Sequence, residues 1–187
     1  NADAELFARW MGIASLLPFA RGHSVKDSVP HEPWAFGAAC EATCRRALNR
    51  RYRLMPYLYT LFHHAATTGV PIVRPVFFAD PKNPALRGID HAFLLGADVL
   101  VVANLVPGQR VIAAPLAGWA SFEPADTHDP ELPRLFIRPG AAVPMGPVVQ
   151  HLGENAIEPL TWVAHLDNRG EACGLLPVLC LMYIAQR

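Results

Sequence analysis

The sequence lacks an excess of charge of either sign. Its 187 residues include 16 Lys and Arg against 16 Asp and Glu, so the formal net charge at pH 7 is zero. A neutral chain has no electrostatic attraction for nucleic acid or for an acidic membrane surface. It also has no run of about 18 apolar residues, the length that a membrane-spanning helix requires. We therefore expect no nucleic-acid partner and no membrane partner.

The sequence is also poor in groups that bind metals or cofactors. It has four cysteines: Cys40, Cys44, Cys173 and Cys180. They form no C-x-x-C pair, and the chain has no Gly-rich phosphate loop and no nucleophile elbow. His63 and His64 are adjacent, so on a helix they point in different directions and cannot hold one ion together. The sequence predicts no metal, no cofactor, and free thiols of the kind found in a reducing compartment.

Proline, in contrast, is abundant. The chain has 18 prolines, whereas a usual protein contains about 5%. Because an interior proline costs a helix about 3 kcal/mol, this content excludes an all-helical bundle. The prolines indicate turns and edge strands in at least part of the chain.

Two segments have helical periodicity. The first covers residues 3–17, where Asp3 is a candidate N-cap. The second covers residues 33–67, where Pro56 predicts a kink and Gly69 closes the helix. Apolar residues of the second segment recur every three or four positions, and we expect them to form a buried stripe: Leu48, Tyr52, Met55, Tyr59 and Phe62.

After Gly69 the pattern changes to short apolar runs. These runs are rich in Val, Ile and Leu and are bounded by Pro, Gly or Asp, which is typical of strands. They cover residues 71–78, 92–103 (broken at Gly96), 110–116, 135–138 and 161–166. Because helices come first and strands follow, the sequence predicts two architectural units, of which the second is an antiparallel sheet or sandwich.

One loop combines groups that suit polyol recognition. Arg21 and His23 lie two residues apart in Pro18–Ser24, directly after the first predicted helix. An imidazole can donate to a hydroxyl, and a guanidinium can hold a carboxylate by two bonds. Spacing alone leaves an ordinary loop as the alternative. No two carboxylates face each other in an apolar frame, as hydrolysis of a glycoside requires.

A series of motifs resembles glycoside hydrolase family 31. The motifs are Glu5–Gly12, Pro18–Ser24, Glu32–Gly37, Arg51–Phe62, Arg74–Phe78, Phe93–Gly96 and Leu135–Gly140. They follow the order of the family over residues 1–174, and the chain is therefore identified as a member.

The resemblance implies both a fold and an activity. Residues 1–69 would form the C-terminal end of a (β/α)8 TIM barrel, with an antiparallel β-sandwich in 70–147 and the start of a distal β-domain in 148–187. The fold class is thus α/β plus all-β. The implied activity is that of a retaining α-glucosidase-type hydrolase acting on α-glucosidic bonds of oligo- or heteroglycans. Its partner would be a carbohydrate substrate, either an α-glucan or a heteroglycan.

The resemblance also implies roles for individual residues. His23 matches the family histidine that contacts the sugar in the subsite where the bond is cleaved, and Arg21 matches its partner arginine. Trp10 matches a tryptophan that packs near the site. The two catalytic aspartates of the family precede the matched motifs, so no residue of this chain is assigned as catalytic. The chain begins Asn1-Ala2-Asp3 without a visible leader, and we expect it to be a fragment.

Finer features point to a subfamily and to an unusual end. Ala20–His23 and Ala125–Pro133 look most like the plant cytosolic heteroglycan glucosidases, which together with the cysteines favours a cytoplasmic location. After Leu176 the family pattern has an acidic run, whereas Pro177–Arg187 is mostly apolar. A splice variant, a frameshift, an intron read-through and a native end all remain open for this tail.

Two alternatives to an enzyme piece stay open. The chain could be a non-catalytic carbohydrate-binding or structural module, with Trp119 or Trp162 as stacking platforms, although such tryptophans are more often core residues. It could also be a truncated product without a function of its own.

The chain alone is expected to be unstable or to aggregate, because half a barrel leaves open sheet edges and an exposed apolar face. Light scattering and thermal unfolding of the purified chain measure this, and a cooperative melt from a monomeric sample would contradict it. The same sample should not hydrolyse p-nitrophenyl α-glucoside. Turnover would refute the expectation that the catalytic carboxylates lie elsewhere.

Overall fold

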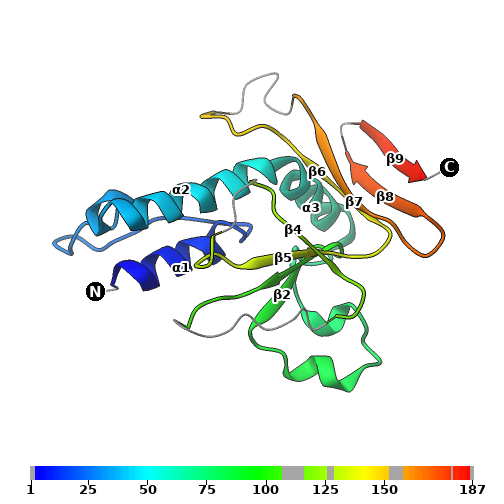
Figure 1. The fold of residues 1–187 in the computed structure, drawn as a ribbon, viewed down its shortest axis with the longest axis horizontal. Coiled ribbons are helices and arrows are strands. Elements are labelled where there is room, and N and C mark those ends of the chain that lie inside the picture. Colours follow the sequence, from blue (N-terminus) through cyan, green and yellow to red (C-terminus); the bar gives the residue numbers. More distant parts are fainter. Residues whose placement is uncertain (1–2, 107–115, 126–128, 152–157, 178, 186–187) are drawn as a thin grey trace.

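The computed structural model describes residues 3–106, 116–125, 129–151, 158–177 and 179–185. Figure 1 shows two long helices side by side at one end of the molecule and two sheets at the other, with a third helix between them. Within the described ranges, no helix has the length and apolar character needed to cross a bilayer.

The helical part begins as the sequence predicts. Helix α1 covers Ala4–Ala14, and the carboxylate of Asp3 accepts a hydrogen bond of 2.8 Å from the backbone N–H of Leu6. This side-chain cap satisfies one of the donors that a helix leaves free at its start. The predicted second helix is divided into the short 3-10 helix η1 (Pro33–Phe36), α2 (Ala38–Arg53) and α3 (Met55–Thr68).

The break between α2 and α3 falls at Leu54, two residues before the predicted kink. Pro56 lies in the first turn of α3, where its missing N–H costs no hydrogen bond. Gly69 ends α3 in the left-handed conformation with φ 76°, as predicted. The chain thus turns between two helices without breaking a central hydrogen bond of either.

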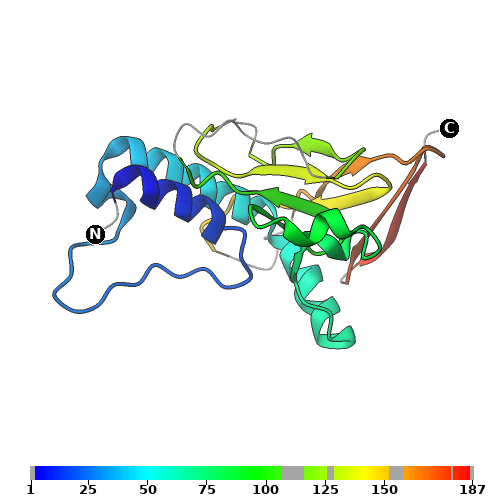
Figure 2. The same ribbon diagram turned by 90° about the horizontal axis from the view of Figure 1, so that it is seen from below.

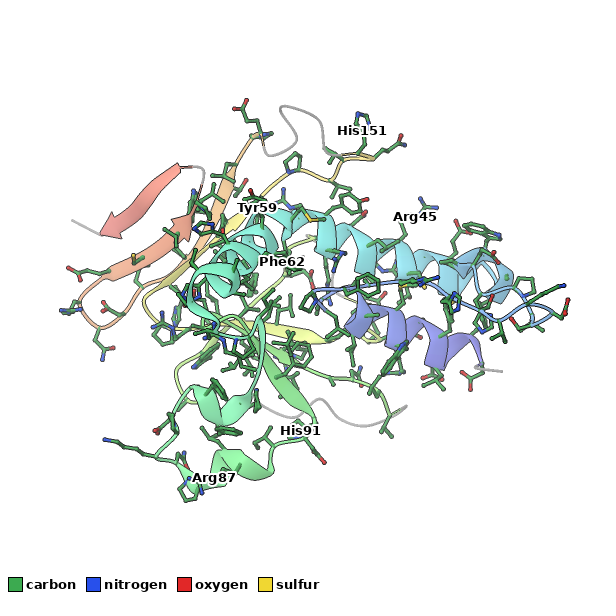
Figure 3. The ribbon with its side chains drawn as sticks, turned by 180° about the vertical axis from the view of Figure 1, so that it is seen from behind. Arg45, Tyr59, Phe62, Arg87, His91 and His151 are labelled. Carbon is green, nitrogen blue, oxygen red and sulfur yellow. The ribbon has the colours of Figure 1, made fainter. Side chains whose placement is uncertain are left out.

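The predicted core stripe on these helices is wrong. Tyr59 and Phe62 are 60% and 49% exposed, Leu48 is also exposed, and Figure 3 shows the first two on α3. The buried side chains are instead Leu54, Tyr57, Leu58 and Leu61. Helix α3 is apolar on both sides, so its periodicity does not reveal which side faces the sheets.

The first sheet has five antiparallel strands in the order β1-β2-β3-β5-β4. The strands are β1 (Val73–Pro75), β2 (Ala92–Leu95), β3 (Val99–Val102), β4 (Ala120–Phe122) and β5 (Arg134–Ile137). The predicted run 92–103 is a hairpin that turns at Gly96, and run 135–138 is β5. Run 71–78 is β1 followed by the 3-10 helix η2 (Val76–Phe78). The predicted strand 110–116 lies almost entirely outside the described residues.

The hairpin turn at Gly96 fits tightly under α3. Gly96 has φ 68°, and a Cβ added there would lie 2.5 Å from Leu61 Cδ2 and 2.5 Å from Tyr57 Oη. The Tyr57 hydroxyl donates a hydrogen bond of 2.8 Å to the carbonyl of Leu95. Only glycine combines this backbone conformation with so close an approach.

The second sheet has the order β7-β6-β8-β9. Its strands are β6 (Ala141–Met145), β7 (Thr161–His165), β8 (Glu171–Leu176) and β9 (Leu179–Ala185). Strands β6 and β8 are parallel and the other pairs are antiparallel, so this sheet is mixed, whereas the first sheet is antiparallel as predicted. Strand β6, which was not predicted, pairs across the proposed boundary at 147/148. The domain boundaries themselves stay predictions.

The largest core lies between α3 and the two sheets. Leu54, Tyr57, Leu58 and Leu61 pack there against residues of β2, β3, β5 and β6. A second cluster covers the opposite face of the first sheet, below η2 and the 3-10 helix η3 (Pro84–Gly88), and Trp119 packs against it. Strand β3 is therefore buried on both faces, which explains its unbroken apolar sequence Val99–Val102. A third, small cluster joins α1 to α2.

Replacing Gly96 by Ala should lower the free energy of unfolding by about 2 kcal/mol or more, since a Cβ adds both left-handed strain and overpacking. The midpoint of urea unfolding measures this change, with the chain completed by the remaining part of the fold that the resemblance implies. Gly88→Ala is the matched control, because no atom lies within 4 Å of a Cβ added there. Equal midpoints for the two variants would contradict the tight fit of the hairpin beneath α3.

Candidate functional site

The candidate site is a hollow between α1, the loop that follows it, and α2. Its volume is about 650 Å³, within the usual range for small-molecule sites. Figure 2 shows the loop as a long trace that leaves the end of α1 and returns to the start of α2. The lining includes all three sequence-predicted site residues, Trp10, Arg21 and His23, together with Leu6, Phe7, Met11, Ala14, Ala20, Gly22, His31, Pro33 and Leu48.

Arg21 and His23 lie together in this hollow. Arg21 Nη2 is 3.2 Å from His23 Nδ1. A guanidinium can only donate, so Nδ1 accepts, and in the neutral ring the proton is then on Nε2. The Nε2–H group is left to donate to another acceptor, such as a hydroxyl. Both side chains are exposed.

Trp10 forms part of the wall that α1 contributes. Its indole is 57% exposed, so in this structure it lines the hollow and is not buried beneath it. Leu6 on the preceding turn is also exposed and lines the same wall. The roles of Trp10, Arg21 and His23 toward a sugar stay predictions.

The loop between α1 and η1, residues 15–32, is called the site loop, and each of its ends is held by a set of contacts. At the start, the Arg51 guanidinium on α2 donates to the carbonyls of Ser15, Leu17 and Pro18. Sequence reasoning assigned this arginine no role of its own. The one available signal was its position in the motif Arg51–Phe62.

The other end of the loop is held by aromatic packing. Phe7 on α1 stacks on Phe36 of η1, with ring centroids 4.2 Å apart. The His31 ring meets Phe36 edge-on at 6.2 Å, and its Nδ1 donates to the carbonyl of Val29 at 2.7 Å. These contacts fix where the chain enters α2.

Charged side chains on helix α2 bind the β part of the chain, which comprises the two sheets and the segments that connect their strands. Arg50 is buried and forms an ion pair with Glu123 through two nitrogens, while its third nitrogen donates to the carbonyl of Pro133. Arg46 Nε donates to Asp129 Oδ2 at 2.6 Å. Each of these carboxylates is thus occupied by an arginine, so the two do not form a catalytic pair.

The environment of Asp129 shifts its acidity. The carboxylate is 4% exposed, and burial by itself raises its pKa. Hydrogen bonds from the Glu131 N–H, from Arg46 and from Thr43 outweigh burial and lower the pKa below its usual value. The carboxylate is therefore held in its charged form.

Cys40 and Cys44 face each other on α2, with their sulfurs 3.9 Å apart and no disulfide between them. Burial raises the pKa of both thiols, that of Cys44 to about 12. Inert thiols of this kind pack as small apolar groups between α1 and α2. Among the described residues, no three His, Cys, Asp or Glu side chains are grouped so as to hold a metal ion.

Comparison with known proteins identifies the family. The profile of the glycosyl hydrolases family 31 TIM-barrel domain matches residues 1–61, and that of the glycosyl hydrolase family 31 C-terminal domain matches residues 69–143. The chain belongs to glycoside hydrolase family 31. These matches confirm the predicted fold class, a barrel end followed by a β-domain.

Individual relatives agree with this assignment. An α-glucosidase of Aspergillus oryzae is 31% identical over 94% of this chain and 20% of the relative. A probable glucan 1,3-α-glucosidase of Arabidopsis thaliana is 38% identical over 65% of this chain and 13% of the relative. The crystal structure of a family 31 α-glucosidase from Bacteroides thetaiotaomicron superposes with a TM-score of 0.81 and 42% identity, over 93% of this chain and 28% of that one. The chain spans about a fifth of the length of the first curated relatives.

The depressed pKa of Asp129 predicts a specific pH dependence. Such a group stabilises the fold fully above its unfolded pKa, and this contribution is lost as the pH falls through the lower folded pKa. Urea midpoints of the unsubstituted protein, with residues 1–176 completed by the rest of a family 31 enzyme, should therefore fall below about pH 4, and Asp129→Asn should flatten this fall.

Thr43→Val removes only one of the three donors, so its profile should lie between those of the unsubstituted protein and Asp129→Asn. Profiles that run parallel from pH 6 downward would show that the Asp129 carboxylate is not held in its charged form.

Proposed function

We propose that this chain supplies the barrel end and β-domain of a retaining α-glucosidase-type hydrolase that acts on α-glucosidic bonds of oligo- or heteroglycans. The observation that carries the proposal is the Arg21–His23 pair, which lies in a hollow of about 650 Å³ within a family 31 fold. Relatives named as α-glucosidases and glucan 1,3-α-glucosidases support the substrate class.

In this proposal the chain binds and orients sugar without supplying the reacting carboxylates. His23 Nε2–H donates to a sugar hydroxyl, and Arg21 fixes the tautomer that makes this possible. A retaining mechanism needs one carboxylate that attacks the anomeric carbon and a second that protonates the leaving oxygen and then activates water. No residue of this chain is assigned to either task.

The burial of two tryptophans weighs against a non-catalytic module in which Trp119 or Trp162 stacks on sugar. Trp119 is half-buried and packs against the second core cluster, and Trp162 is also half-buried. A cytoplasmic location and the boundaries 1–69, 70–147 and 148–187 belong to the proposal as well.

A hybrid enzyme tests the proposal. Residues 1–176 replace the matching segment of the Bacteroides thetaiotaomicron α-glucosidase, which supplies the remaining parts of the fold. The hybrid should hydrolyse p-nitrophenyl α-glucoside. His23→Ala should lower kcat/KM about 100-fold, the usual cost of losing one donor to a transition state.

His63→Ala is the matched control, because His63 is an exposed histidine on α3 away from the hollow. If the two substitutions have equal effects, or if an active hybrid tolerates His23→Ala, the proposed role of His23 is wrong.

A further inference from the structure

One side chain on α2 reaches the root of the site loop. Arg51 Nη1 donates to the carbonyls of Ser15 at 2.9 Å and Leu17 at 2.7 Å, and Nη2 donates to the carbonyl of Pro18 at 3.2 Å. These acceptors lie 33 to 36 residues away in the sequence. A single guanidinium therefore binds successive turns of the chain as it leaves α1.

One of the three acceptors belongs to the end of α1: Ser15 is its C-cap residue, and Leu17 and Pro18 follow it. The last carbonyls of a helix have no partner within it and carry partial negative charge. Basic side chains often fill this role from the last turn of the same helix, but the last turn of α1 has none. Arg51 supplies from α2 the cation that α1 lacks.

After Pro18 the site loop has few contacts with the rest of the protein. Every residue from Phe19 to Asp27 is exposed, and the Phe19 side chain is 77% exposed. Pro18 lies three residues before Arg21 and five before His23. The direction in which the chain leaves Pro18 therefore helps to set where the Arg21–His23 pair lies.

We propose that Arg51 is the positioning residue of the Arg21–His23 pair: by fixing the carbonyls of Ser15, Leu17 and Pro18, it aims both side chains into the hollow. The functional part of this inference rests on the proposed function. The anchoring part rests on the hydrogen bonds alone and can be tested without activity.

Arg53 provides a matched control on the same helix. It is half-buried like Arg51, and it also donates to backbone carbonyls, those of Pro124 and Gly146, each at 3.0 Å. Its partners belong to the β part and not to the site loop. Loss of Arg53 should thus reproduce any general loss of stability but not a change at the site.

Limited trypsin digestion of the hybrid enzyme tests the anchoring. The quantity measured is the cleavage rate after Arg21 divided by that after Arg134, which lies in β5 between β3 and β4 and reports general unfolding. Arg51→Met should raise this ratio about tenfold above its value in the unsubstituted protein, since several charge-assisted hydrogen bonds are lost, and Arg53→Met should leave it unchanged. Equal ratios for the two variants would overturn the proposal.

The hybrid enzyme tests the functional part. Arg51→Met should lower kcat/KM for p-nitrophenyl α-glucoside about tenfold, and Arg51→Lys should restore part of the loss, because an ammonium also donates three hydrogen bonds. Arg53→Met should leave kcat/KM unchanged.

The outcomes separate the two proposals. If His23→Ala has no effect on an active hybrid, the proposed function fails, while the trypsin ratios still decide whether Arg51 anchors the loop. If His23→Ala is damaging and Arg51→Met behaves like Arg53→Met, the positioning role fails and the proposed function stands.

Discussion

The structure depends on arginines in the last turns of α2 whose partners lie far away in the sequence. Arg50 reaches Glu123 and Pro133, Arg51 reaches the end of α1, and Arg53 reaches Pro124 and Gly146. A charge taken out of water is costly unless its hydrogen bonds are satisfied. Each of these guanidiniums meets that condition with carboxylate or carbonyl oxygens, so one helix holds the helical part, the site loop and the β part together.

The break at Leu54 complements these contacts. It lets α2 point its arginines at loops while α3 turns its apolar side toward the sheets. Leu54 is itself fully buried in the largest core, together with Tyr57, whose hydroxyl is tied to the hairpin β2–β3. Charged contacts on one helix and apolar contacts on the next thus position the same set of strands.

Local features of the fold could be predicted from the sequence. The Asp3 cap, the turn at Gly96 and the end of α3 at Gly69 each follow from the chemistry of one residue and its neighbours. The buried side of α3 could not be predicted, because Tyr59 and Phe62 are large and mainly apolar like Leu58 and Leu61 on the other side. Strand β6 contains Pro144 and follows Gly140, and both residues hide a strand from pattern reasoning.

The candidate site shows the same division. The spacing of Arg21 and His23 is compatible with both side chains on one side of a loop, and their contact in the structure is local. The anchor at Arg51 joins residues more than thirty positions apart, which no periodicity reveals. Motif resemblance marked the segment Arg51–Phe62 but carried no information about which carbonyls the arginine binds.

The most direct test of this account is a double-mutant cycle between Arg51 and His23 in the hybrid enzyme, measured by kcat/KM. If Arg51 acts by aiming His23, then Arg51→Met should have almost no further effect once His23 is Ala. If the fold-losses in kcat/KM of the two single variants multiply in the double variant, the account is contradicted. Arg51 would then act independently of His23, the residue that we propose it positions.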